Sequence, residues 1–195
     1  MGVERDRLTD GAVSEVPYGR LILGGIGVGA VVFGLGSRLA MRVVGLVASP
    51  EHLGDQTAFG VVGKVTVAGV VGLVVFGAFA GLFTGLLYLG VRLWVPGTWL
   101  VRGLVFGLLL LPPVGIFILA SSRADFGLTS PTLILAVLAA MILVEALGTA
   151  WLIEKLGRDT LPAPRRRAGA YVVLGVVASL GFVALAASVS NVVSP

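Results

Sequence analysis

The stretch Val65–Val91, VTVAGVVGLVVFGAFAGLFTGLLYLGV, decides the fold of this chain. It holds 27 consecutive residues without a charge, and glycine recurs at every fourth position in Gly77, Gly81 and Gly85. A helix rises 1.5 Å per residue, so about 20 residues cross the roughly 30 Å hydrocarbon core of a bilayer. The stretch therefore predicts a transmembrane helix with one face of small residues.

The rest of the chain has the same character. Of its 195 residues, 57% are hydrophobic and 12% are charged, whereas soluble proteins carry about 25% charged residues. We therefore predict an all-α fold, a polytopic transmembrane helix bundle of one domain over residues 21–195, preceded by a cytoplasmic polar tail over residues 1–20. The uncharged stretches predict five spans, at about residues 21–42, 65–91, 99–122, 131–153 and 169–190.

The positive charges predict how the bundle is oriented. Ten Lys and Arg residues lie in the N-terminal tail and in the loops after the second and fourth spans, and four lie on the other side. Basic loops favour the cytoplasm, and Trp favours the headgroup level, where Trp94, Trp99 and Trp151 would all lie on the same side. We expect a cytoplasmic N-terminus and an external C-terminus.

The same charges indicate lipid as a partner. Arg165, Arg166 and Arg167 form the basic cluster of the chain, directly before the last predicted span. Anionic lipid headgroups are the nearer partner for such a cluster, so we expect no nucleic-acid binding.

Several kinds of chemistry are excluded or disfavoured by composition. The chain has no cysteine, and its one histidine, His52, lies in a predicted loop. Thiolate catalysis, cysteine metal sites and iron–sulfur clusters are therefore excluded. The predicted spans contain no histidine that could activate a serine nucleophile. They also lack the pair of aspartates that an aspartyl protease needs. We expect no enzymatic activity, no cofactor and no metal site.

Small residues four positions apart predict faces where helices approach closely, because packing in lipid depends on such contacts. These faces are expected either inside one bundle or against another subunit. The residues are Gly25 and Gly29 in the first span, Gly77, Gly81 and Gly85 in the second, and Gly103 and Gly107 in the third.

Two adjacent prolines, Pro112 and Pro113, fall in the middle of the third span. Proline removes a backbone donor and kinks a helix, which frees carbonyl groups for other partners. The pair predicts either a bent helix or a hinge.

Glu145 is a carboxyl group well inside the fourth span, where a charge is costly and typically faces the bundle interior. Counting residues from the membrane surfaces places Arg102 within reach, and we expect these two residues to pair. Four further polar residues are predicted at a similar depth and would form a polar layer with Glu145 and Arg102. This layer has either a structural role or the role of a proton or cation site. The four residues are Thr84, Tyr88, Thr149 and Ser179.

Arg38 and Arg42 are four residues apart and share a helix face at the outer end of the first span. Long basic side chains at such a position reach toward lipid headgroups. They predict either this ordinary anchoring or a site for an anion or lipid phosphate.

The stretch Gly36–Arg42 (GSRLAMR), followed by a glycine-rich span that closes on Leu87-Tyr88, Arg92 and Val95-Pro96, resembles a pattern in small, uncharacterised multi-pass bacterial membrane proteins. The resemblance covers about the first half of the chain. It implies a bacterial inner-membrane location and supplies no activity.

Two functions compete at this point. The first is a structural or accessory subunit that docks through its glycine-rich faces in a homo-oligomer or on another membrane protein. The second is a small proton- or cation-linked transporter or channel that uses Glu145.

Overall fold

The computed structural model describes residues 18–47, 56–57, 60–61, 67–121, 131–158, 160–161 and 168–193. The chain begins with α1 (Tyr18–Gly29), continues through the π-helical turn η1 (Ala30–Leu35) into α2 (Gly36–Val47), and then forms two paired strands, β1 (Gln56–Thr57) and β2 (Gly60–Val61). Four long helices follow, which are α3 (Val67–Val91), α4 (Trp99–Ser121), α5 (Pro131–Leu156) and α6 (Ala168–Val193).

The predicted all-α helical bundle is confirmed. Four stretches among the described residues are long and apolar enough to cross a membrane, namely Tyr18–Ala40, Gly69–Val91, Trp99–Ile118 and Leu135–Leu156. The helix predicted over residues 169–190 forms as α6, which holds the shorter apolar stretch Leu174–Val189.

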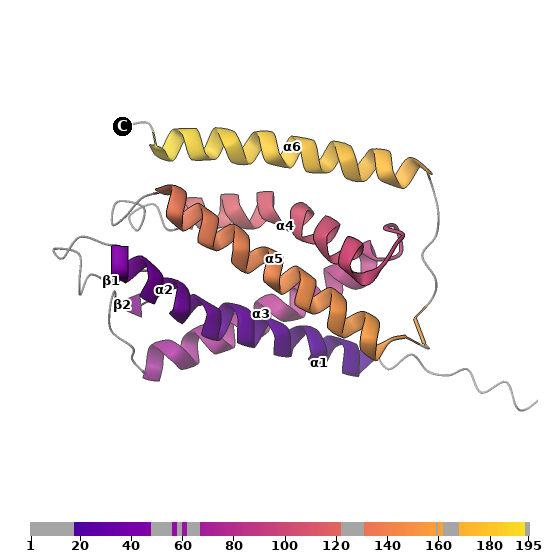
Figure 1. The fold of residues 1–195 in the computed structure, drawn as a ribbon, viewed down its shortest axis with the longest axis horizontal. Coiled ribbons are helices and arrows are strands. Elements are labelled where there is room, and N and C mark those ends of the chain that lie inside the picture. The colour runs from indigo at the N-terminus through magenta and orange to yellow at the C-terminus, as the bar shows by residue number, and fades with distance from the viewer. Residues whose placement is uncertain are drawn as a thin grey trace, which may run out of the picture.

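Successive long helices run in alternating directions, so the starts of α1, α4 and α6 lie at the same end of the bundle as the ends of α3 and α5 (Figure 1). We call this the Glu154 end and the opposite one the Arg38 end. At the Glu154 end, a turn over residues 95–98 joins α3 to α4. Gly97 in this turn has a positive φ of 112°, a backbone conformation that favours glycine.

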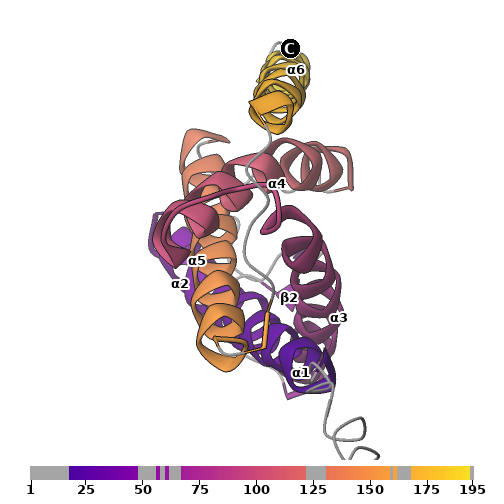
Figure 2. The same ribbon diagram turned by 90° about the vertical axis from the view of Figure 1, so that its right-hand side faces the viewer.

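The helix α6 stands apart from the others and packs on α4 (Figure 2). At this contact, a Cβ added to Gly181 would lie 2.9 Å from the Cβ of Pro112, and one added to Gly115 would lie 2.9 Å from Leu185 Cδ1. The helix α4 continues through Pro112 and Pro113 as a single helix. The proline pair therefore lies within one helix, and Pro112 forms part of the bed for α6.

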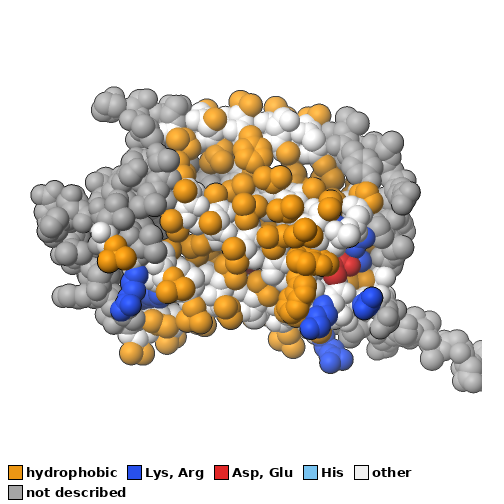
Figure 3. All heavy atoms as spheres, viewed as in Figure 1, with side chains coloured by type: hydrophobic (Ala, Val, Ile, Leu, Met, Phe, Trp, Pro, Cys, Tyr) orange, Lys and Arg blue, Asp and Glu red, His pale blue; other side chains and the backbone are white. Residues whose placement is uncertain are grey.

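On the face shown in Figure 3, charged side chains lie toward the two ends and hydrophobic side chains cover the part between them. Many large apolar side chains are exposed, such as Leu23, Phe83 and Val183. Such a surface suits contact with lipid rather than water. The polar tail before Tyr18 and the cluster Arg165–Arg167 lie outside the described residues.

Candidate functional site

The glycines of the first two spans bring α1 and α3 into close contact. A Cβ added to Gly25 would lie 2.7 Å from the carbonyl oxygen of Gly81, and one added to Gly77 would lie 2.8 Å from the nitrogen of Gly34. Gly29 likewise meets the backbone of Gly77 and Gly81. The backbones of α1 and α3 therefore cross in direct contact, within the chain.

The second pair of small residues joins α4 to α5. Gly103 faces Ala150 and Leu147, and Gly107 faces Leu143 and Ala146. The other side of α5 meets α1, where Gly148 faces Val28. The helix α5 thus lies between α1 and α4, and it also contacts α3.

Glu145 lies in this enclosed space. It is 1% exposed, and within the part of the chain that the structure describes neither of its carboxylate oxygens has a hydrogen-bond partner. Thr149, one turn later on α5, is 0% exposed and its hydroxyl also lacks a partner. Thr84 of α3 lies beside the carboxylate, but its hydroxyl donates to the Ala80 carbonyl at 2.8 Å. Three neighbouring buried oxygens are therefore left without a hydrogen bond.

The predicted pair of Glu145 with Arg102 is wrong. Arg102 Nη1 donates instead to Glu154 Oε1 at 2.7 Å. The register explains the difference, because Gly107 lies opposite Leu143 and Ala146 whereas Arg102 precedes Gly103, which lies opposite Leu147 and Ala150. Glu145 is therefore more than one helical turn away from the level of Arg102.

Glu154, on the last turn of α5, accepts four hydrogen bonds from three side chains at the end of α3, directly after it and at the start of α4. Arg92, directly after α3, donates from Nε to Oε1 at 2.9 Å and from Nη2 to Oε2 at 3.2 Å. The Tyr88 hydroxyl donates to Oε1 at 3.1 Å. Arg102 donates from Nε to the Val95 carbonyl at 3.1 Å, besides its bond to Glu154. We call Tyr88, Arg92, Arg102 and Glu154 the inner cluster.

The sequence held a signal for this cluster that the prediction missed. Counting uncharged residues places Glu154 at the start of a loop, although the helical pattern of α5 runs on through Leu156. Glu154 follows Leu147 and Ala150 on the α4-facing side of α5. Glu154 lies in the last turn of its span, and Arg92 and Arg102 lie on either side of the turn between the two preceding spans. This pattern predicts a carboxylate–arginine cluster at one membrane surface.

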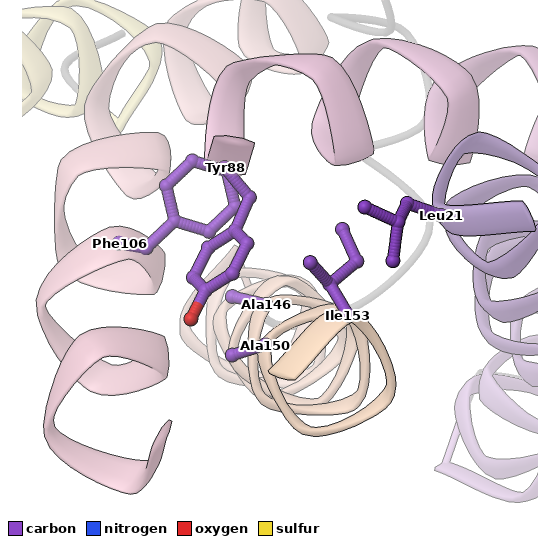
Figure 4. Close-up of a cluster of buried hydrophobic side chains, with 6 residues drawn as sticks. All are labelled: Leu21, Tyr88, Phe106, Ala146, Ala150 and Ile153. Atoms are coloured by element: carbon purple, nitrogen blue, oxygen red, sulfur yellow. The ribbon is translucent and has the colours of Figure 1, made fainter. Parts of the chain in front are cut away.

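A hydrophobic cluster lies along the turns of α5 between Glu145 and Glu154, and side chains of α1, α3 and α4 complete it. It consists of Leu21, Tyr88, Phe106, Ala146, Ala150 and Ile153, each at most 1% exposed (Figure 4). The rings of Tyr88 and Phe106 meet edge to face, with centroids 5.3 Å apart. Tyr88 belongs to both clusters, because its ring packs here and its hydroxyl bonds to Glu154.

Ser179, Arg38 and Arg42, which the sequence marked as candidate site residues, lie away from Glu145. Ser179 is exposed on α6, where its hydroxyl donates to the Gly175 carbonyl, so its place in the layer is also wrong. Its helix packs on α4, away from the enclosed side of α5. Arg42 is exposed at the Arg38 end. Arg38 is half-buried there, and its Nε and Nη2 have no hydrogen-bond partner among the described residues.

The oxygen atoms around Glu145 decide whether a metal ion or a proton could bind there. Among the described residues, no three His, Cys, Asp or Glu side chains come together as metal ligands would. Glu145 and Thr149 offer one carboxylate and one hydroxyl in a dry interior, which suits a proton better than a metal ion. Comparisons of the chain with protein-family models, with curated proteins and with solved structures find no match.

Proposed function

We propose that the protein is a small proton-linked transporter or channel of the membrane, and that Glu145 is the group that binds and releases the proton. The observation that carries the proposal is the burial of both carboxylate oxygens of Glu145 with no hydrogen-bond partner. A charged carboxylate without partners in such a place costs several kcal/mol. The group is therefore stable there with a proton bound, and a second state must admit water or a partner to release it.

The chemistry of the surroundings supports a proton over a metal cation. Hard cations take about six oxygen ligands. The described side chains next to Glu145 supply only the hydroxyls of Thr84 and Thr149, and that of Thr84 already donates to a backbone carbonyl. Both hydroxyls can still accept a hydrogen bond from a protonated carboxyl group.

The second function, an accessory subunit, is favoured by one observation. The glycines predicted as packing faces in α1, α3 and α4 meet a neighbouring helix within the chain, so they are occupied rather than open to a partner; they are Gly25, Gly29, Gly77, Gly81, Gly85, Gly103 and Gly107. The small residues of α6 are different, because a Cβ added to Gly175 would meet nothing within 4 Å and Ser179 is exposed. A subunit function would therefore dock a partner through α6.

The location and orientation that fit this function follow from the charges. We infer a bacterial inner-membrane protein with the Glu154 end in the cytoplasm. The described basic residues support this, with Arg20, Arg92, Arg102, Lys155 and Arg158 at that end and Arg38 and Arg42 at the other. Tyr18, Trp94, Trp99 and Trp151 are exposed at the Glu154 end, as expected of a headgroup-level belt.

The test is proton flux in liposomes that contain the purified full chain and a pH-sensitive dye. A potassium gradient with valinomycin drives the flux. Glu145→Gln is expected to abolish it, and Ser179→Ala, on the exposed side of α6, is expected to leave it unchanged. Infrared spectra supply a second readout, because the carbonyl band of a protonated carboxylic acid should disappear in Glu145→Gln.

Three results would change the proposal. Unaltered flux in Glu145→Gln would reject Glu145 as the proton site. Flux that depends on sodium or potassium ions rather than on protons would make the site a cation site. A preparation that shows no flux and holds a second membrane protein, lost on substitution of Gly175 by Leu, would favour the accessory subunit.

A further inference from the structure

We propose that the inner cluster is a gate that closes the route between Glu145 and the membrane surface at the Glu154 end. The inference rests on the proposed function, because it assigns control of access to the same carboxyl group. It concerns the described helices α3, α4 and α5, whose ends the cluster joins.

The position of the cluster supports a gate. Glu154 follows Glu145 by nine residues on α5, which is about 13 Å along the helix axis. The hydrophobic cluster lies within this interval, with Tyr88, Ala150 and Ile153 each 0% exposed and Phe106 1% exposed. These side chains are closed to solvent in this conformation, so the described interval between Glu154 and Glu145 is lined by buried apolar groups.

The inner cluster holds that hydrophobic cluster in place. The bond from the Tyr88 hydroxyl to Glu154 fixes the ring that packs against Phe106. Glu154 also forms ion pairs with Arg92, directly after α3, and with Arg102 of α4. A single carboxylate thus controls both the aromatic pair and the spacing of three helix ends, so its release would free the ring of Tyr88 and the first turn of α4 together.

The cluster is also placed where it can open. The Glu154 side chain is 18% exposed, so water can compete for its hydrogen bonds. The crossing of α1 and α3 is different, because its glycine backbones touch and cannot separate without losing a continuous contact. Opening at the inner cluster can therefore occur while the α1–α3 crossing stays intact.

The chain offers a clean probe because it has no native cysteine. We place a single cysteine at Thr149 in the full-length protein and measure its reaction with a membrane-impermeant thiol reagent, added separately to each side of membrane vesicles. A second protein with Lys155→Cys, exposed beside Glu154, identifies the side that holds the Glu154 end. The expected result is slow labelling of Thr149→Cys from that side.

Glu154→Gln is expected to speed this labelling about tenfold, the factor that corresponds to about 1.4 kcal/mol. Tyr88→Phe removes one hydrogen bond and keeps the ring, so a smaller increase is expected. Lys155→Gln, which alters the neighbouring charge, is expected to leave the labelling rate unchanged. Glu154→Asp keeps the charge and replaces Glu154→Gln if that variant is not monodisperse after purification.

The results separate the gate from the proposed function. Labelling that is equally slow in every folded variant overturns the gate, even where Glu145→Gln abolishes proton flux. Labelling that rises in Glu154→Gln while Glu145→Gln leaves flux unchanged supports the gate and rejects the proton site. An equal rise in Lys155→Gln would assign the effect to surface charge and also overturn the gate.

Discussion

Arg102 Nη1 donates to Glu154 Oε1 across 2.7 Å, which ties the first turn of α4 to the last turn of α5. The same guanidinium donates from Nε to the carbonyl of Val95, in the turn that precedes α4. The Arg102 side chain therefore links the turn before α4, the first turn of α4 and the last turn of α5. Glu145, deeper on α5, has no hydrogen bond to either arginine of the inner cluster.

Arg102→Met should lower the free energy of unfolding by about 2 to 3 kcal/mol, because methionine keeps an apolar stem and loses both charge-assisted hydrogen bonds. The same substitution at the exposed Arg42 should change it by less than about 0.5 kcal/mol. Thermal unfolding of the two variants in the same detergent checks the prediction. A loss as large in Arg42→Met would show that the cluster geometry is not what stabilises the Glu154 end.

Gly81→Ala should destabilise the protein by about 3 kcal/mol or more, since the added Cβ would overlap the backbone of Gly25 and lie 2.8 Å from the Cα of Gly29. Gly72→Ala on the same helix is the matched control, because its Cβ would meet nothing within 4 Å. Alanine there should be neutral or stabilising by up to about 1 kcal/mol. Chemical unfolding of both variants in one detergent measures the difference, and equal stabilities would argue against the α1–α3 crossing.

The span boundaries were predictable because the cost of a charge in lipid is large and local. The predicted spans over residues 65–91 and 99–122 correspond to α3 (Val67–Val91) and α4 (Trp99–Ser121). Glycine spacing also indicated which faces approach closely, and Gly25, Gly29, Gly77 and Gly81 do lie at one crossing. The sequence did not indicate that α5 lies between α1 and α4, because apolar helices show little difference between lipid-facing and protein-facing sides.

The candidate site was predictable only in part, because the sequence indicates how deep a side chain lies in the membrane but not which neighbouring helix it faces. Counting residues from the membrane surface fixes the depth of a side chain to about one turn, and Thr84 does lie beside Glu145. It cannot fix the direction in which a side chain points. Arg102 and Glu154 share a face of the α4–α5 contact, so they pair, whereas Glu145 faces the enclosed side of α5.

Glu145→Met should raise the thermal stability of the protein while it abolishes proton flux. The substitution removes two buried oxygens that lack hydrogen bonds and fills the same space with apolar atoms, which should add about 1 kcal/mol to the free energy of unfolding. Glu154→Met is the matched comparison, and it should destabilise because it leaves Arg92 and Arg102 without their shared carboxylate. A stability loss in Glu145→Met would indicate that the carboxyl group has a structural partner.

Gly181→Leu should displace α6 from α4 without unfolding the remaining helices. A side chain at position 181 would overlap Pro112, which is buried under α6, whereas the contacts among α1, α3, α4 and α5 do not involve Gly181. Hydrogen–deuterium exchange should therefore rise along α6 and stay low in α3 and α5. Gly175→Leu is the control on the same helix, because a Cβ there meets nothing within 4 Å, and its exchange pattern should match that of the parent chain. Exchange that rises throughout the protein in Gly181→Leu would mean that α6 is integral to the bundle rather than attached through α4.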